Sequence, residues 1–145
     1  MRPESRGCAA LTSAALLALG SLVAGAAAEE SQAGVCTVSV GRGATAPGGA
    51  TGVMTVRNVG RPCRIVNFSA PESRVATSRL EIVKAPAGGR LEIVQPNVVA
   101  YTPREGFTGA DEFAYGGSGP GREGRTLPFS VRISVRVVGP GEAVR

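Results

Sequence analysis

The most constraining feature of the sequence is a strict two-residue alternation near its C-terminal end, in "TLPFSVRISVRVV" at residues 126–138. The residues on one face are all apolar: Leu127, Phe129, Val131, Ile133, Val135 and Val137. Serine and arginine hold most of the opposite positions. Because side chains alternate between the two faces of a β-strand, this pattern predicts a half-buried strand of an antiparallel sheet. Pro128 cannot donate a ladder hydrogen bond, which predicts an edge or a break near the start of this strand.

Shorter runs of the same kind recur along the rest of the chain. They are "VCTVSV", "GVMTVRNV", "CRIVNF", "SRLEIVK", "GRLEIVQ", "VVAYT" and "DEFAY". Stretches rich in Gly and Pro separate them, and no amphipathic pattern indicates a helix. Many short strands with regular turn signals predict an all-β fold, an antiparallel sandwich of about seven or eight strands with its core at residues 35–138. The repeated "RLEIV" is interpreted as two neighbouring strands in similar environments.

The N-terminal segment has the order of a secretory signal. Arg2 and Arg6 precede an apolar run, and the small residues of a cleavage site follow at Ala26 and Ala28. We expect residues 1–28 to be removed as a signal peptide, leaving a periplasmic or secreted single domain at residues 29–145 with no stable membrane anchor. A retained anchor is the alternative, because the apolar run is close to the length that spans a bilayer.

Two of the three cysteines, Cys36 and Cys63, lie outside this segment. Since oxidising compartments favour disulfides, export predicts a Cys36–Cys63 bridge, with two buried thiols as the alternative. Few other side chains suit catalysis, because the chain has no His and Asp111 is its only Asp. Histidine is the commonest general base, and no His/Cys metal centre can be built. We therefore expect no enzyme activity, no catalytic residue, no cofactor and no bound metal.

The segment "YTPREGFTGADEFAY" predicts a corner between two strands. Pro103 fixes φ, and Gly106 and Gly109 can take backbone angles that are closed to other residues. Phe107 is too apolar for an exposed tip, so we expect it to plug one end of the core. Asp111 is expected to accept backbone N–H hydrogen bonds from the corner. Three further aromatic side chains are expected to point inward: Tyr101, Phe113 and Tyr115.

The same corner resembles the Ig-like and cadherin-like domains of bacterial exported and surface proteins, which often occur in tandem arrays. The matching residues are Pro86, Gly89, Tyr101, Pro103, Gly106, Phe107, Gly109, Asp111, Phe113 and Tyr115. The resemblance covers residues 79–138 well and residues 36–78 only by strand pattern. It implies an Ig-like sandwich that serves protein–protein interaction or structural support in the cell envelope. Calcium-binding domains of this type need several carboxylates, so the single Asp argues against a calcium site.

Charge and loops indicate where a partner would bind. The formal net charge is +5, and the arginines are scattered along the chain, so no nucleic-acid footprint is evident. The candidate surface combines two Gly-rich loops, residues 41–52 and 116–126, with five arginines: Arg42, Arg122, Arg125, Arg132 and Arg136. An unknown protein is the expected partner, and an anionic envelope polymer such as lipopolysaccharide is the alternative. Flexible loop tips without a partner are the remaining interpretation.

Overall fold

The computed structural model describes residues 34–70 and 75–145, and these form an all-β structure. The predicted signal peptide, residues 1–28, lies outside the described residues. The elements in chain order are β1 (Cys36–Val40), β2 (Ala50–Arg57), β3 (Cys63–Val66), β4 (Phe68–Ala70), β5 (Val75–Ala76), β6 (Arg79–Lys84), β7 (Gly89–Gln95), β8 (Val98–Pro103), β9 (Gly109–Pro120), a 3-10 turn η1 (Arg122–Gly124) and β10 (Thr126–Val138). The predicted number of strands is too low, because β4 and β5, with 3 and 2 residues, are too short to give a periodic signal. No helix in the described part of the chain is long and apolar enough to cross a membrane.

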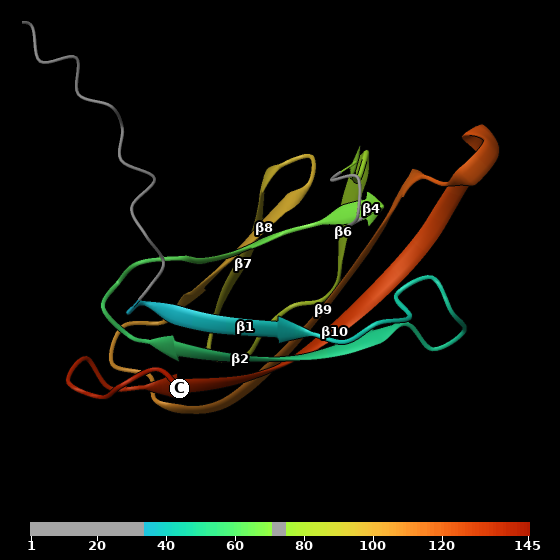
Figure 1. Ribbon diagram of the computed structural model, residues 1–145. Coiled ribbons are helices and arrows are strands. Elements are labelled where there is room, and N and C mark those ends of the chain that lie inside the picture. The colour runs from blue at the N-terminus through green and yellow to red at the C-terminus, as the bar shows by residue number, and fades with distance from the viewer. Residues whose placement is uncertain (1–33, 71–74) are drawn as a thin grey trace, which may run out of the picture.

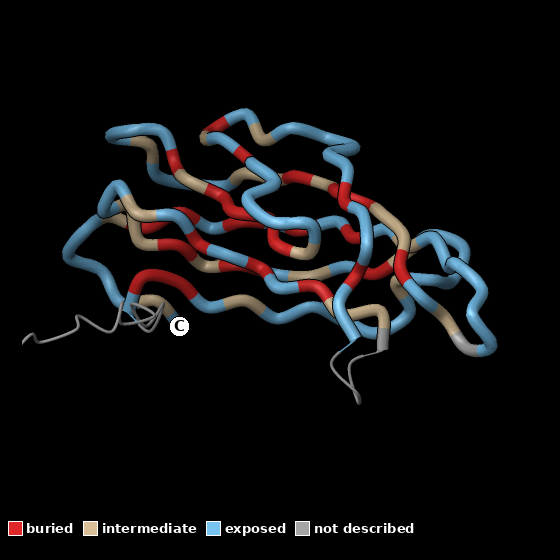
Figure 2. The backbone as a smooth tube through the Cα atoms, turned by 90° about the horizontal axis from the view of Figure 1, so that it is seen from above, coloured by how far each residue is buried: buried red, intermediate tan, exposed pale blue. Residues whose placement is uncertain are grey.

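The strands form two facing sheets and one small hairpin (Figure 1). The larger sheet has the order β1-β2-β10-β9-β6, the smaller has the order β3-β8-β7, and β4 pairs with β5. In the larger sheet β2 and β10 run parallel, and the other neighbouring strands run antiparallel. Buried residues gather along the strands on the inner side and exposed residues in the connections and outer positions (Figure 2). The result is a sandwich-like arrangement of open sheets.

The alternating segment forms β10, and its inward residues lie at the centre of the core. Val131, Ile133, Val135 and Val137 are all buried. Leu127, which belongs to the same apolar face, is instead 42% exposed. The reason is that β10 pairs with β2 only from Val131 onward, so its first residues extend past the core with β9 alone beside them. Pro128 lies in this one-sided stretch, where its missing N–H costs no ladder hydrogen bond.

The prediction of a loop at residues 116–126 is wrong for most of this segment. β9 continues to Pro120 and β10 begins at Thr126, which leaves only a short turn at the tip of a long hairpin (Figure 1). Close packing explains the glycines: a Cβ on Gly117 would lie 2.0 Å from the carbonyl oxygen of Arg79 on β6. These glycines therefore permit a close backbone approach inside a sheet, not a flexible loop. The end of the other predicted loop, from Ala50, likewise belongs to β2.

One long side of the sandwich is closed by a covalent bond. Cys36 of β1 is disulfide-bonded to Cys63 of β3, so the bond joins the larger sheet to the smaller one. This confirms the predicted bridge, and a disulfide is consistent with an oxidising, extracytoplasmic compartment. The opposite side is formed by β6 and β7, which follow each other in the chain and are each the edge of a different sheet.

Candidate functional site

The carboxylate of Asp111 ties the corner to both sheets. Its Oδ1 accepts hydrogen bonds from the backbone N–H groups of Ala87 and Glu112, each at 2.9 Å. Its Oδ2 accepts from the backbone N–H of Gly88 at 2.9 Å and from the hydroxyl of Tyr101 at 2.8 Å. Asp111 lies on β9 of the larger sheet and Tyr101 on β8 of the smaller one. One side chain therefore links the two sheets at this end of the sandwich.

These hydrogen bonds set the protonation states of both partners. Burial alone would raise the pKa of Asp111, but the hydrogen bonds, led by that from Tyr101, outweigh burial and hold this pKa below its usual value of 3.8. Burial raises the pKa of the Tyr101 hydroxyl, and the hydrogen bond to Asp111 raises it further. Asp111 is thus ionised at neutral pH with two donors on each oxygen. Because a carboxylate offers about four acceptor positions, none is left for a general-base role or a metal ion.

Asn58 and Phe107 complete the corner. The Nδ2 of Asn58 donates hydrogen bonds to the carbonyl oxygens of Arg104 at 2.8 Å and Phe107 at 2.9 Å. The Phe107 side chain packs against the hydrophobic core. Gly106 and Gly109 have positive φ angles of 73° and 118°, which residues with a Cβ rarely adopt. The corner is therefore held by polar contacts on both of its sides.

Replacing Gly88 by alanine should lower the free energy of unfolding by about 1–3 kcal/mol, a typical cost of overpacking. The added Cβ would lie 2.3 Å from a ring carbon of Phe107, which would have to leave its place against the core. Gly141→Ala is the matched control, since a Cβ there meets no atom within 4 Å. Urea unfolding of both variants measures the difference, and equal midpoints would show that Phe107 can move freely.

The five arginines of the predicted binding surface do not converge on one site. Arg132 and Arg136 are exposed on the outer face of β10, about 13 Å apart along the strand. Arg125 is exposed immediately before β10, at the tip of the long hairpin, and Arg42 is exposed in the connection between β1 and β2. The side chain of Arg122 lies outside the described residues. Of the four arginines whose side chains are described, Arg132 and Arg136 alone share a surface.

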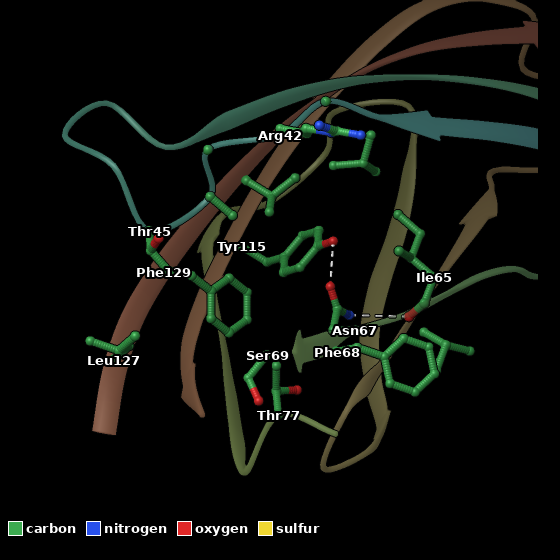
Figure 3. Close-up of a pocket in the computed structure, with 16 residues that line it drawn as sticks. Arg42, Thr45, Ile65, Asn67, Phe68, Ser69, Thr77, Tyr115, Leu127 and Phe129 are labelled. Carbon is green, nitrogen blue, oxygen red and sulfur yellow. Dashed lines mark hydrogen bonds between the residues drawn. The ribbon is translucent and has the colours of Figure 1, made fainter. Parts of the chain in front are cut away.

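A pocket of about 480 Å³ opens between the sheets near the base of the β9–β10 hairpin (Figure 3). Its walls come from the connection after β1, from β3 and the start of β4, and from the first half of β10. Tyr115 of β9 and Thr77 contribute polar groups to the lining. The predicted loop at residues 41–52 therefore contributes to a pocket through Arg42 and its neighbours, which sequence reasoning did not foresee.

Two buried polar side chains lie in this pocket. Asn67 accepts a hydrogen bond from the hydroxyl of Tyr115 at 2.8 Å, and its Nδ2 donates to the carbonyl oxygens of Ile65 at 3.2 Å and Asn97 at 3.3 Å. Burial raises the pKa of Tyr115, so its hydroxyl stays protonated and donates to Asn67. Thr77 is only 4% exposed, and its Oγ1 has no hydrogen-bond partner among the described residues. The side chain of Asn67 therefore has hydrogen-bond partners for both its oxygen and its nitrogen, whereas the hydroxyl of Thr77 has none among the described residues.

A row of aromatic rings connects the corner to the pocket. The ring centroids of Tyr101 and Phe113 are 5.5 Å apart, and those of Phe113 and Tyr115 are 6.3 Å apart. Tyr115 then meets Phe129 edge-on at 6.5 Å. Tyr101, Phe113 and Tyr115 are almost completely buried. The aromatic residues of the corner motif thus form the middle of the core, and the row ends at Phe129 in the pocket wall.

Within residues 34–70 and 75–145, no three side chains of His, Cys, Asp or Glu form a group that could hold a metal ion. No protein-family model matches the chain, and no curated protein matches it. The resemblance to Ig-like and cadherin-like domains therefore stays a prediction that depends on the corner motif.

Proposed function

We propose that the protein is an exported, non-catalytic Ig-like module that binds an extended segment of another protein at the edges of its sheets. The observation that carries this proposal is the set of exposed apolar side chains on β6 and β7. The signal-like N-terminal sequence and the Cys36–Cys63 disulfide support export. Two facing sheets joined by that disulfide, and the corner built on Tyr101 and Asp111, support the Ig-like assignment.

The repeated "RLEIV" gives β6 and β7 the same construction. In each strand the leucine, Leu80 or Leu91, is 7% exposed and belongs to the core. The following apolar residues face solvent: Ile82 41%, Val83 65%, Ile93 41% and Val94 47% exposed. Each valine also lies at a register shift of its ladder, as the extra residue of a β-bulge. A bulge changes the direction of the side chain of its extra residue, so the bulge explains why both valines are exposed.

Both strands have a hydrogen-bonded neighbour on one side only, within the part of the chain that the structure describes. An edge strand presents unpaired backbone N–H and C=O groups, and an extended peptide can add to it as a further strand. Apolar side chains beside those groups give the added strand area to bury. Two such edges, each with two exposed apolar side chains, therefore offer places where a partner strand can pair and bury apolar surface.

Val83→Lys should weaken capture of the envelope partner by the tagged protein at least tenfold, about 1.4 kcal/mol of binding free energy. The change places a charge where the partner strand would pack, and lysine is a residue that natural edges use to prevent pairing. Val53→Lys is the control, because Val53 is 62% exposed but lies on β2, which has neighbours on both sides. Val94→Lys tests the second edge separately.

Two other outcomes of this pull-down assign the binding elsewhere. In one outcome, capture survives both edge variants but falls with added salt and in the Arg132→Gln/Arg136→Gln variant. The partner is then an anionic polymer that binds the outer face of the larger sheet, and the edge proposal is wrong. A specific observation favours that second candidate: Arg132 and Arg136 are both exposed on the outer face of β10, and the register places the smaller residues Thr51 and Ala114 directly beside Arg132. Capture that changes with neither set of variants contradicts both surfaces.

A further inference from the structure

We propose that the pocket near the base of the β9–β10 hairpin binds a small, elongated carboxylate with an apolar chain. Its carboxylate would lie at Arg42, its chain along the apolar walls, and a terminal hydroxyl at Thr77 (Figure 3). The site is separate from the β6 and β7 edges that carry the proposed function. None of its contacts depends on a protein partner.

The walls of the pocket suit an apolar chain. Its volume of about 480 Å³ lies within the range of small-molecule sites, which are lined mainly by apolar side chains with a few polar groups. Two of its inward-facing apolar side chains remain exposed, Val40 at 40% and Leu127 at 42%. They come from β1 and β10 of the larger sheet, and the buried Ile65 of β3 lines the pocket from the smaller sheet. An apolar chain between them would remove their surface from water, which is favourable.

The unpaired hydroxyl of Thr77 indicates that the ligand carries a hydrogen-bonding group. Its Oγ1 is buried and unpaired among the described residues, and buried polar atoms in folded proteins almost always have a partner. The other two buried polar side chains that line the pocket, Tyr115 and Asn67, already form a hydrogen bond with each other. Thr77 lines the pocket, and rotation about its χ1 bond would turn Oγ1 toward a ligand hydroxyl or carbonyl.

Arg42 supplies the charge for the opposite end of the ligand. It is the only charged residue among the described residues that line the pocket, and it forms no ion pair with any of them. In Figure 3 Arg42 lies on the far side of the pocket from Thr77, with Tyr115 between them. A cation at one end and an unpaired hydroxyl at the other define a ligand that is polar at both ends and apolar in the middle.

Calorimetric titration of the oxidised protein tests this directly. The probes are straight-chain carboxylates from hexanoate to dodecanoate, each with and without a terminal hydroxyl, and alkyltrimethylammonium ions of the same lengths. We expect one carboxylate per chain and no binding of the cations. At the best chain length, the hydroxylated form should bind about three to ten times more tightly than the plain form, as expected for one added hydrogen bond.

Matched variants assign the contacts. Arg42→Gln should weaken carboxylate binding about fivefold or more, while Arg136→Gln, an exposed arginine on the outer face, should leave it unchanged. Thr77→Val keeps the shape of the side chain and should abolish the advantage of the hydroxylated form only. Leu127→Ala removes an exposed part of the wall that lies outside the hydrophobic core cluster, and it should weaken the binding of every carboxylate. Val53→Ala, at another exposed valine, is its control.

The proposal is overturned if no carboxylate binds, or if Arg42→Gln and Leu127→Ala leave the affinity of every carboxylate unchanged. It is also overturned if the hydroxylated and plain forms bind equally to the wild-type protein. In that case the partner of Thr77 is an ordered water molecule, which buried polar sites of this size can hold. Thermal unfolding of each variant establishes that a lost affinity does not come from a lost fold.

Discussion

Replacing Cys36 and Cys63 together by alanine will lower the free energy of unfolding by about 3–4 kcal/mol, and this loss is a large part of the stability that a domain of this size has. The two cysteines are 27 residues apart in the sequence, so the bond closes a loop whose freedom is restored in the unfolded chain of the variant. Loss of the two buried sulfur atoms adds to the cost.

Urea unfolding of the oxidised protein, the reduced protein and the double alanine variant separates these two contributions. The reduced protein keeps both side chains and loses only the bond, so its midpoint should lie between the other two. Because the bond is the covalent connection between β1 and β3, hydrogen exchange in those two strands should rise most on reduction. Equal midpoints for the oxidised and reduced proteins would contradict the assigned role of the disulfide.

The alternating segment shows why much of the all-β fold could be predicted. Each inward position of β10 from Val131 to Val137 is apolar, and a shift of one residue would expose the whole set. The same logic placed the buried aromatic residues of the corner, because Phe113 and Tyr115 are two residues apart on one strand. Periodicity is a local property, so the sequence alone is enough to detect it.

The glycines of β9 show what local reasoning cannot determine. In the sequence "GGSGPGREG" has the composition of a flexible loop. In the structure Gly117 and Gly119 lie where a side chain would collide with Arg79 or Ser69, residues far away in the chain. The need for glycine comes from the neighbouring strand, and no property of the segment itself reveals that neighbour.

The pocket residues differ in how visible they are in the sequence. Asn67 continues the inward positions of Cys63 and Ile65, so a polar residue at that position signals a buried hydrogen-bonding group. Thr77 gives no such signal, because it follows β5, a strand of only 2 residues. Its burial results from the packing of distant segments. Likewise, the exposure of Ile82 and Ile93 follows from their edge positions, which strand order decides.

Replacing Asp111 by alanine should lower the free energy of unfolding by about 2–4 kcal/mol, since hydrogen bonds to a charged group are each worth about 1.5–3 kcal/mol and are not additive. The variant leaves the N–H groups of Ala87 and Gly88 and the hydroxyl of Tyr101 without their acceptor. Asp111→Asn should lower the free energy of unfolding by less. Its amide oxygen can still accept two of the four hydrogen bonds, and the other two donors lose their acceptor. In the Asp111→Asn background, Tyr101→Phe should cost less than in the wild type, which a double-mutant cycle measures.

The pH dependence of stability gives an independent test of this anchor. The pKa of Asp111 is lower in the folded protein than its usual 3.8, so its contribution is fully present above pH 3.8 and is lost as pH falls through the folded-state pKa. Glu112, whose pKa is lowered by Lys84, titrates in the same region from the exposed side of β9. Comparison with Asp111→Asn, which retains Glu112, isolates the anchor: below about pH 4 the wild type should lose stability more steeply than the variant. Parallel curves for the two proteins would show that Asp111 does not serve as an ionised structural acceptor. A melting temperature that rises by many degrees on adding calcium would contradict the inference that its carboxylate has no position left for a metal ion.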